Sequence, residues 1–196
     1  MNISKQELQE ELKVGRKKSA KPMLWVSMIS MVMFFAGLTS AYVISMRRDD
    51  WVTFDLPDAF YTSTFLIILS SITIFISQRL IKKEKRELSI AFLLTTLVLG
   101  VAFVWFQWIG FNELKDAGLY FTGKESTVST SFIIGITLMH VIHIAAGIIV
   151  LLVVIYNHFK YRYKADDLLG FELGAIFWHF VDVLWIYLFF FFYFIR

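Results

Sequence analysis

The chain has 196 residues, of which 58% are hydrophobic, 18% are charged and 21 are phenylalanine, and its formal net charge is +3. Soluble domains carry about 25% charged residues, so this composition excludes a soluble globular domain, because that much apolar surface could not be shielded from water. The sequence contains no cysteine, which excludes disulfide bonds and thiolate metal sites.

The first 21 residues form a polar, mixed-charge segment, which we predict to be a short helical tail. Beyond it, stretches that are nearly free of Asp, Glu, Lys and Arg predict spans at 22–46, 59–78, 88–112, 128–156 and 172–195. Each is long enough, because a hydrocarbon core about 30 Å thick needs about 20 helical residues. Backbone groups inside lipid must be paired within their own segment. The sequence therefore predicts an all-α integral membrane protein, with residues 22–196 as one bundle of five transmembrane helices.

The positions of Lys and Arg predict the orientation of this bundle. With five spans, the tail and the connections at 79–87 and 160–172 share one side of the membrane. That side carries fourteen of the 19 basic residues, and the opposite side carries Arg47, Arg48, Lys115, Lys124 and Arg196. Because basic residues accumulate in cytoplasmic segments, we expect the amino terminus inside the cytoplasm and the carboxyl terminus outside.

Polar side chains inside the last two spans require an explanation, because a charge at membrane depth costs about 2.5–3.5 kcal/mol on insertion scales. His140 and His143 lie near the middle of the fourth span. Glu172, His179 and Asp182 share one face of the fifth span, by their spacing of three and four residues. Since a short connection makes the two helices neighbours, the first interpretation is that these side chains hydrogen-bond across the pair and set its register. We call these five residues the polar seam.

Other interpretations of the polar seam stay open. His140 or His143 together with His179 could ligate a haem, and the same residues with Asp182 offer ligand types for zinc or iron. Glu172 and His179 could also begin a track for protons or lipid headgroups. Ser70, Ser71 and Thr73 in the second span and Gln107 in the third are interpreted as helix-packing groups. We expect no catalytic, cofactor-binding or metal-ligating residue in this chain.

One segment of the fifth span carries a strong resemblance. Residues 170–185, Gly-Phe-Glu-Leu-Gly-Ala-Ile-Phe-Trp-His-Phe-Val-Asp-Val-Leu-Trp, closely resemble the signature of cytochrome c oxidase subunit III. Residues 131–147, which contain His140 and His143, are similar to the H-x-x-H helix of that family. Weaker similarity is found at 33–37 and 69–73.

The resemblance implies an accessory core subunit of a proton-pumping haem-copper terminal oxidase, a translocase of the aerobic respiratory chain. Such a subunit holds no haem or copper itself; these cofactors lie in partner subunits. It packs with catalytic subunit I and subunit II, binds phospholipid and supports proton uptake, while cytochrome c or another donor supplies electrons to the complex. By position, His140, His143, Glu172, His179 and Asp182 take structural, lipid or proton-handling roles. No nucleic acid is implied.

The chain departs from the longer family members in two respects. It has five predicted spans where they have seven, a short form that is familiar in bacteria and implies the bacterial inner (cytoplasmic) membrane. Met31 stands where the family commonly has a buried carboxylate, and a thioether cannot ionise. Subunit III of a quinol oxidase, or a relative associated with nitric oxide reductase, remains an alternative. A small membrane haem protein or a transporter is a further one.

Overall fold

The protein is described by a computed structural model that covers residues 5–53, 55–121, 123, 126–163 and 168–195. Its helices are α1 (Lys5–Ser45), α2 (Asp58–Lys82), α3 (Arg86–Asp116), α4 (Val128–Phe159) and α5 (Leu169–Phe194). Within these residues there is no strand, and a single isolated bridge joins Tyr120 to Ser126. All five helices are long and apolar enough to cross a membrane. The predicted all-α fold with five spans is therefore confirmed.

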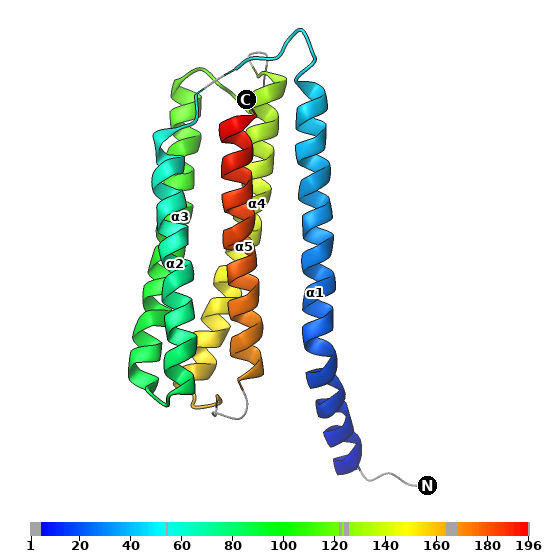
Figure 1. The fold of residues 1–196 in the computed structure, drawn as a ribbon, viewed down its shortest axis with the longest axis vertical. Coiled ribbons are helices and arrows are strands. Elements are labelled where there is room, and N and C mark those ends of the chain that lie inside the picture. The colour runs from blue at the N-terminus through cyan, green and yellow to red at the C-terminus, as the bar shows by residue number, and fades with distance from the viewer. Residues whose placement is uncertain (1–4, 54, 122, 124–125, 164–167, 196) are drawn as a thin grey trace.

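Each helix extends past its predicted span at one end or at both, because a helix continues through the interface after the apolar segment has ended. The third one runs over 86–116 where the absence of charge predicts 88–112. The difference is largest in α1, which includes most of the polar tail and contains Pro22. In Figure 1 the first turns of α1 reach beyond the other helices and angle away from them. Lys124, Lys164 and Arg196, which enter the charge asymmetry, lie outside the described residues.

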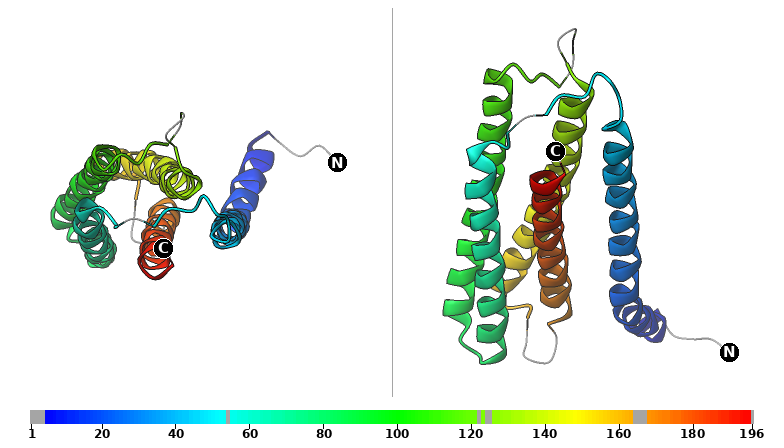
Figure 2. Two further views of the ribbon diagram at one scale, coloured as in Figure 1. Left: turned by 90° about the horizontal axis from the view of Figure 1, so that it is seen from above. Right: turned by 45° about the horizontal axis from the view of Figure 1, so that its top comes forward.

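Helices α2, α3, α4 and α5 close into a ring, since each packs against the next and α5 packs back against α2. Helix α1 stands outside this ring and packs only against α4 and α5, within the described part of the chain. The left view of Figure 2, which looks along the helices, shows these four helices grouped together with α1 to one side of them. The connection from α1 to α2 crosses the end of the bundle at which α5 finishes, called here the C-terminal end (Figure 1).

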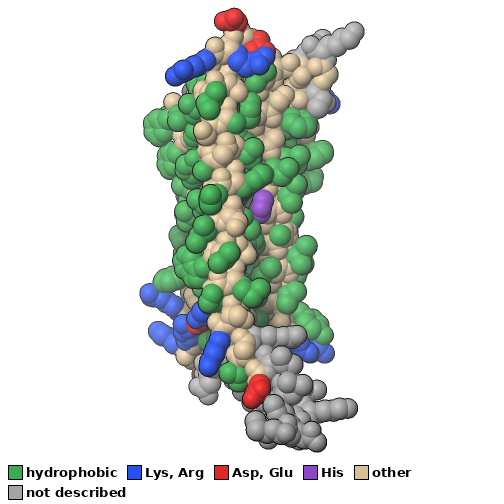
Figure 3. All heavy atoms as spheres, turned by 90° about the vertical axis from the view of Figure 1, so that its right-hand side faces the viewer, with side chains coloured by type: hydrophobic (Ala, Val, Ile, Leu, Met, Phe, Trp, Pro, Cys, Tyr) green, Lys and Arg blue, Asp and Glu red, His purple; other side chains and the backbone are tan. Residues whose placement is uncertain are grey.

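Large aromatic side chains fill the ring, and the outside of the bundle is apolar as well. Trp178 and Trp185 of α5, Phe60 of α2 and Phe103 of α3 are at most 1% exposed. Outward-facing residues such as Val98, at 66% exposure, are also hydrophobic. Figure 3 shows the face on the α1 side, with hydrophobic side chains along its length and Lys and Arg near the two ends. This distribution suits a protein that has lipid around its middle and water at its ends.

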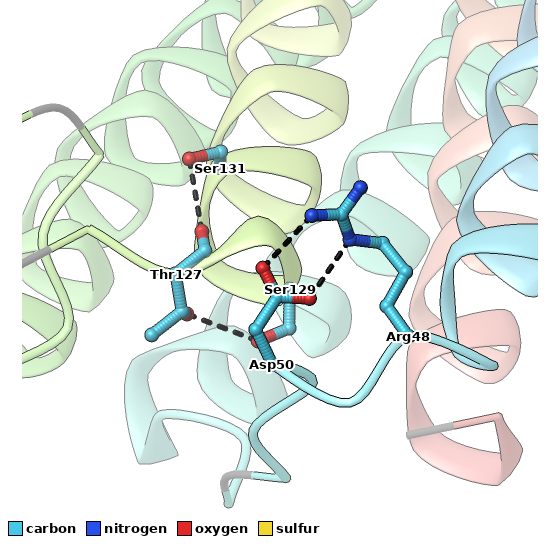
Figure 4. Close-up of polar contacts among 5 residues, drawn as sticks. All are labelled: Arg48, Asp50, Thr127, Ser129 and Ser131. Carbon is cyan, nitrogen blue, oxygen red and sulfur yellow. Dashed lines mark hydrogen bonds and ion pairs between the residues drawn. The ribbon is translucent and has the colours of Figure 1, made fainter.

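Short polar networks order the C-terminal end of the bundle (Figure 4). Arg48 donates from Nε and Nη2 to the two carboxylate oxygens of Asp50, at 2.8 and 3.0 Å. The hydrogen bonds from Arg48 lower the pKa of the Asp50 carboxyl below its usual value. Thr127 caps α4, because its Oγ1 accepts a hydrogen bond from the Thr130 backbone N–H. The Ser131 hydroxyl donates to the Thr127 carbonyl oxygen at 3.0 Å, which reinforces this first turn.

Candidate functional site

The polar face of α5 turns toward α2. His179 Nδ1 and Ser71 Oγ share a hydrogen bond of 2.6 Å. Asp182 lies one turn further along the same face and is only 1% exposed. The Ser71 hydroxyl also lies near the Asp182 carboxyl, but neither carboxyl oxygen has a hydrogen-bond partner among the described residues. His179 is therefore the polar residue of this face that hydrogen-bonds the second helix.

The same face of α2 also holds the two tryptophans of the α5 signature. The Trp185 indole N–H donates to Thr64 Oγ1 at 2.9 Å. The Trp178 indole N–H donates to Ser70 Oγ at 3.1 Å. Thr64 lies six residues before Ser70 and seven before Ser71, which is about two helical turns along α2. A buried indole N–H usually finds a partner, and in this protein α2 supplies both partners.

Hydroxyl and amide groups also join α2 to α3. Thr73 and Thr96 share a hydrogen bond of 2.8 Å, and Ser77 and Ser89 share one of 3.0 Å. Nearer the C-terminal end, Gln107 Nε2 donates to Ser63 Oγ at 2.9 Å. The interpretation of Gln107 and Thr73 as helix-packing groups agrees with these contacts. Small hydroxyls let the two backbones approach closely, and α2 and α3 form the most extensive helix pair in the bundle.

His140 lies in an apolar environment. The side chain is 0% exposed, and neither ring nitrogen has a hydrogen-bond partner among the described residues. Its ring lies 5.2 Å from the Trp185 indole, between ring centroids, at a tilt of 30°. The edge of Phe103 approaches from α3 at 6.1 Å. His140 thus packs among aromatic rings at the centre of the helix ring.

His143 points in another direction. Its Nδ1 hydrogen-bonds the Met139 carbonyl oxygen of its own helix at 2.6 Å. Its ring packs against Phe35 of α1 at 5.5 Å between centroids. Residues three apart on a helix point about 60° away from each other. His140 therefore faces the interior of the ring, while His143 lies against the helix outside it.

The expected hydrogen bonds between α4 and α5 are therefore not formed, and that interpretation was wrong. Neither His140 nor His143 bonds to His179 or Asp182 within the described residues. The physical reason is the closure of the ring. Helix α5 packs against both α4 and α2. Its polar face meets the hydroxyls of α2, and the indole of Trp185 packs against His140.

Glu172 joins three helices at the other end of the bundle, where α5 begins. Its carboxylate pairs with Lys21 Nζ of α1 at 2.9 Å and with Lys82 Nζ of α2 at 3.5 Å. The Glu172 side chain is 26% exposed, and both lysines are about half exposed. Exposed ion pairs stabilise by about 0.2–1 kcal/mol. The ion pairs contribute more to the arrangement of the helices than to stability, because the pair with Lys21 connects α1 to the ring.

The ligand sets of the haem and metal interpretations are not assembled by this geometry. His179 is engaged with Ser71 of α2, and His140 is enclosed by aromatic rings. In the part of the chain that the structure describes, no group of three or more His, Cys, Asp or Glu side chains is placed to hold a metal ion.

The sequence indicated that Ser70 and Ser71 are helix-packing groups, and the structure shows that they bond to α5. Sequence reasoning missed Thr64, which accepts the hydrogen bond from Trp185. A signal was present in the second span, where Ser and Thr recur at 63, 64, 70, 71 and 77, which is a repeat of seven residues. Such a repeat places side chains on one face of a helix. Without knowing which helix lay opposite, that face could not be connected to the tryptophans of α5.

A ring of apolar helices with polar groups turned inward, and a further helix outside, defines a multi-pass α-helical membrane protein. The sequence profile of the family described as "Cytochrome c oxidase subunit III" matches residues 14–196. The chain belongs to this family.

Relatives from distant organisms carry the same description. The chain is similar to cytochrome c oxidase subunit 3 of Pyricularia grisea, with 31% identity over 136 residues, which cover 69% of this chain and 47% of that protein. The Neurospora crassa protein is 30% identical over the same length and the same shares of both chains. The Salmo salar protein is 26% identical over 138 residues, 70% of this chain and 51% of the relative. The chain spans about half the length of the curated relatives it matches.

Proposed function

We propose that this chain is an accessory core subunit of a haem-copper terminal oxidase of the cytochrome c oxidase type. The match of residues 14–196 to the subunit III family carries this proposal. The signature of α5 supports it, because its most distinctive side chains serve internal packing. Trp178, His179 and Trp185 all donate to or share hydrogen bonds with α2 hydroxyls. The α5 signature therefore stabilises the packing of the helix bundle, as expected of a structural subunit.

In this proposal the scaffold supports partner subunits that hold the haem and copper. The partners are the catalytic subunit I and subunit II, and cytochrome c delivers electrons through the complex. The chain spans the bacterial cytoplasmic membrane with residues 1–21 as a cytoplasmic tail and its carboxyl terminus outside. The excess of Lys and Arg on the tail side supports this orientation. Glu172, with Lys21 and Lys82, lies at that end, where it would influence proton uptake at the surface of the complex.

In this proposal the main role of the polar seam is structural. His179 holds the α5 face against α2 by its hydrogen bond to Ser71, and Asp182 lies buried on the same face. His140 packs against Trp185 of α5, and His143 packs against Phe35 of α1. Phospholipid is proposed to fill an apolar groove of about 300 Å³ between α1 and α5. The Thr39–Tyr187 hydrogen bond of 3.0 Å lies toward one end of this groove, and the Lys21–Glu172 ion pair lies toward the other. An acyl chain would restore the van der Waals contacts that an empty groove forfeits.

Purification in mild detergent through a tag on the amino-terminal tail tests the proposal. We expect the catalytic and copper-carrying subunits to copurify, together with the haem absorbance of the complex. The same chain expressed without those partners should show no haem absorbance. Stoichiometric haem or metal on the isolated chain would overturn the proposal. A catalytic partner without a subunit that carries a dinuclear copper domain would instead identify the quinol oxidase alternative.

A further inference from the structure

Three buried polar side chains inside the helix ring carry hydrogen-bonding atoms without a partner. They are Gln107 of α3 and Thr137 and His140 of α4, and each is at most 1% exposed. Among the described residues, Gln107 Oε1, Thr137 Oγ1 and both ring nitrogens of His140 form no hydrogen bond. Leaving a buried polar group unpaired is costly. Three such side chains on two neighbouring helices therefore indicate a ligand that bonds to them.

The three side chains lie close together. Helices α3 and α4 pack against each other and run in opposite directions (Figure 1). Phe103 faces His140 across this pair, with 6.1 Å between the ring centroids. Gln107 comes four residues after Phe103, and Thr137 comes three residues before His140, so Gln107 and Thr137 lie level on the two helices. Thr137 and His140 are neighbours on α4, since Cβ atoms three residues apart on a helix are about 5–6 Å from each other.

The hydrogen-bonding atoms of this group suit water. Gln107 Nε2 already donates to Ser63 Oγ at 2.9 Å, which leaves the amide oxygen as an acceptor. A threonine hydroxyl both donates and accepts, and a neutral imidazole offers one donor and one acceptor nitrogen. Buried waters typically make about 3 hydrogen bonds to polar groups of this kind. An apolar ligand would leave all of these atoms unpaired.

A cavity between α3 and α4 leads to this group from the C-terminal end of the bundle. Its volume is about 600 Å³, and Gln107 forms part of its wall. Asn112, Lys115 and Tyr120 line it near the C-terminal end. A water molecule takes up about 30 Å³ in the liquid, so the cavity is large enough to admit water. Its polar residues therefore give water a route to the inside of the ring.

We propose that the inside of the helix ring binds water between Gln107, Thr137 and His140, with the cavity between α3 and α4 as its route. The bound water completes the hydrogen bonding of these buried side chains and joins α3 to α4. His140 lies near the middle of its span, so the route carries water from the C-terminal end about halfway across the membrane. The site does not depend on assignment of the chain to an oxidase.

Reaction of single introduced cysteines with silver ions tests the proposal. The chain has no cysteine of its own, so each variant carries one thiol in this chain. Thr137→Cys probes the site, and Ile144→Cys is the matched control, because both positions are 0% exposed and lie two turns apart on one face of α4. The protein, with any partners that copurify, is treated with silver ions in proteoliposomes, unfolded in SDS, and labelled at the remaining free thiols with maleimide–polyethylene glycol.

The two cysteine variants should differ in this labelling. A thiol reacts as the thiolate, which does not form readily in apolar surroundings. We therefore expect silver ions to block the thiol of Thr137→Cys, which then loses its maleimide labelling, and to leave the thiol of Ile144→Cys free. Equal labelling of the two variants, whether both are blocked or both are free, would overturn the proposal.

Thr137→Val gives a second test, in which the sign of the effect decides. The change keeps the shape of the side chain and removes the hydroxyl. If that hydroxyl bonds to water, the variant loses a hydrogen bond, and its thermal midpoint in detergent should fall. If the hydroxyl has no partner, its removal relieves a buried unpaired group, and a midpoint that rises or stays the same shows that the proposal is wrong. Thr95→Val, on the exposed face of α3, is the control and should keep the wild-type midpoint.

Discussion

The Trp178 indole N–H donates a hydrogen bond of 3.1 Å to the Ser70 hydroxyl inside the helix ring. The rest of the indole fills space that two glycines leave open. A Cβ atom at Gly100 of α3 would lie 2.6 Å from Trp178 Cη2, and one at Gly147 of α4 would lie 3.3 Å from Cε3. One side chain of α5 thus contacts α2 by a hydrogen bond and α3 and α4 by close packing. Four helices meet at this residue.

Ser70→Ala tests the hydrogen bond at this junction. The change leaves the buried indole N–H of Trp178 without an acceptor, and we expect the free energy of unfolding to fall by about 1 kcal/mol. The measurement is an SDS titration of the purified chain, followed by circular dichroism. Ser40→Ala, on the exposed face of α1, is the control and should leave the midpoint unchanged. Equal midpoints for Ser70→Ala and wild type would show that the bond contributes nothing.

Gly100→Leu tests the close packing. A side chain at this position would overlap the buried Trp178 ring, and overpacking costs about 1–3 kcal/mol or more. We expect a lower thermal midpoint in detergent. Gly37→Leu is the matched control, because nothing lies within 4 Å of a Cβ atom at Gly37. There the change replaces a helical glycine, and it should stabilise the helix by about 0.5–1 kcal/mol. A lower midpoint for both variants would argue against the specific role of Trp178.

Glu172→Gln tests the attachment of α1. The substitution removes both ion pairs, so the tail-side end of α1 should separate from the ring while its other end stays held by Thr39 and Tyr187. Because the sequence has no cysteine, spin labels can be placed freely on introduced ones. We expect a broader distance distribution between labels at positions 20 and 83, and an unchanged one between labels at 43 and 61. High salt should also broaden the distance distribution between labels at positions 20 and 83 in the wild-type chain, since salt screens exposed charges.

Asp182→Leu tests the buried carboxyl. Both Asp182 oxygens lack a hydrogen-bond partner among the described residues, and the side chain is 1% exposed. Membrane insertion of α5 should become more favourable by about 2.5–3.5 kcal/mol, the cost of an Asp at the centre of a span. An insertion assay on α5, read by glycosylation of its two flanks, measures this. Ser71→Ala should lower the stability of the folded chain, because it removes the hydrogen-bond partner of His179. Reduced insertion of the leucine variant would indicate that Asp182 has a partner in the membrane.

Local sequence was sufficient to predict the spans, because hydrophobicity and the absence of charge are properties of each segment by itself. The second predicted span, 59–78, lies inside α2 at 58–82, and the fifth, 172–195, overlaps α5 at 169–194 almost completely. The ends differ because helices continue into charged interfacial residues such as Lys82, which the criterion of missing charge excludes.

Only the tertiary structure decided which residues meet. The sequence showed that His179 and Asp182 share one face of α5, but it did not show which helix lies opposite that face. Helix α5 packs against both α4 and α2, and sequence adjacency alone favours α4. Ring closure brought α2, more than one hundred residues away, against the polar face, so that Ser71 bonds to His179. The sequence also placed His140 in the middle of its span. Its packing against Trp185 follows from the closure of the ring as well. Hydrophobicity is a property of each segment of the sequence, whereas the rotation of each helix about its axis depends on all the helices that pack against it.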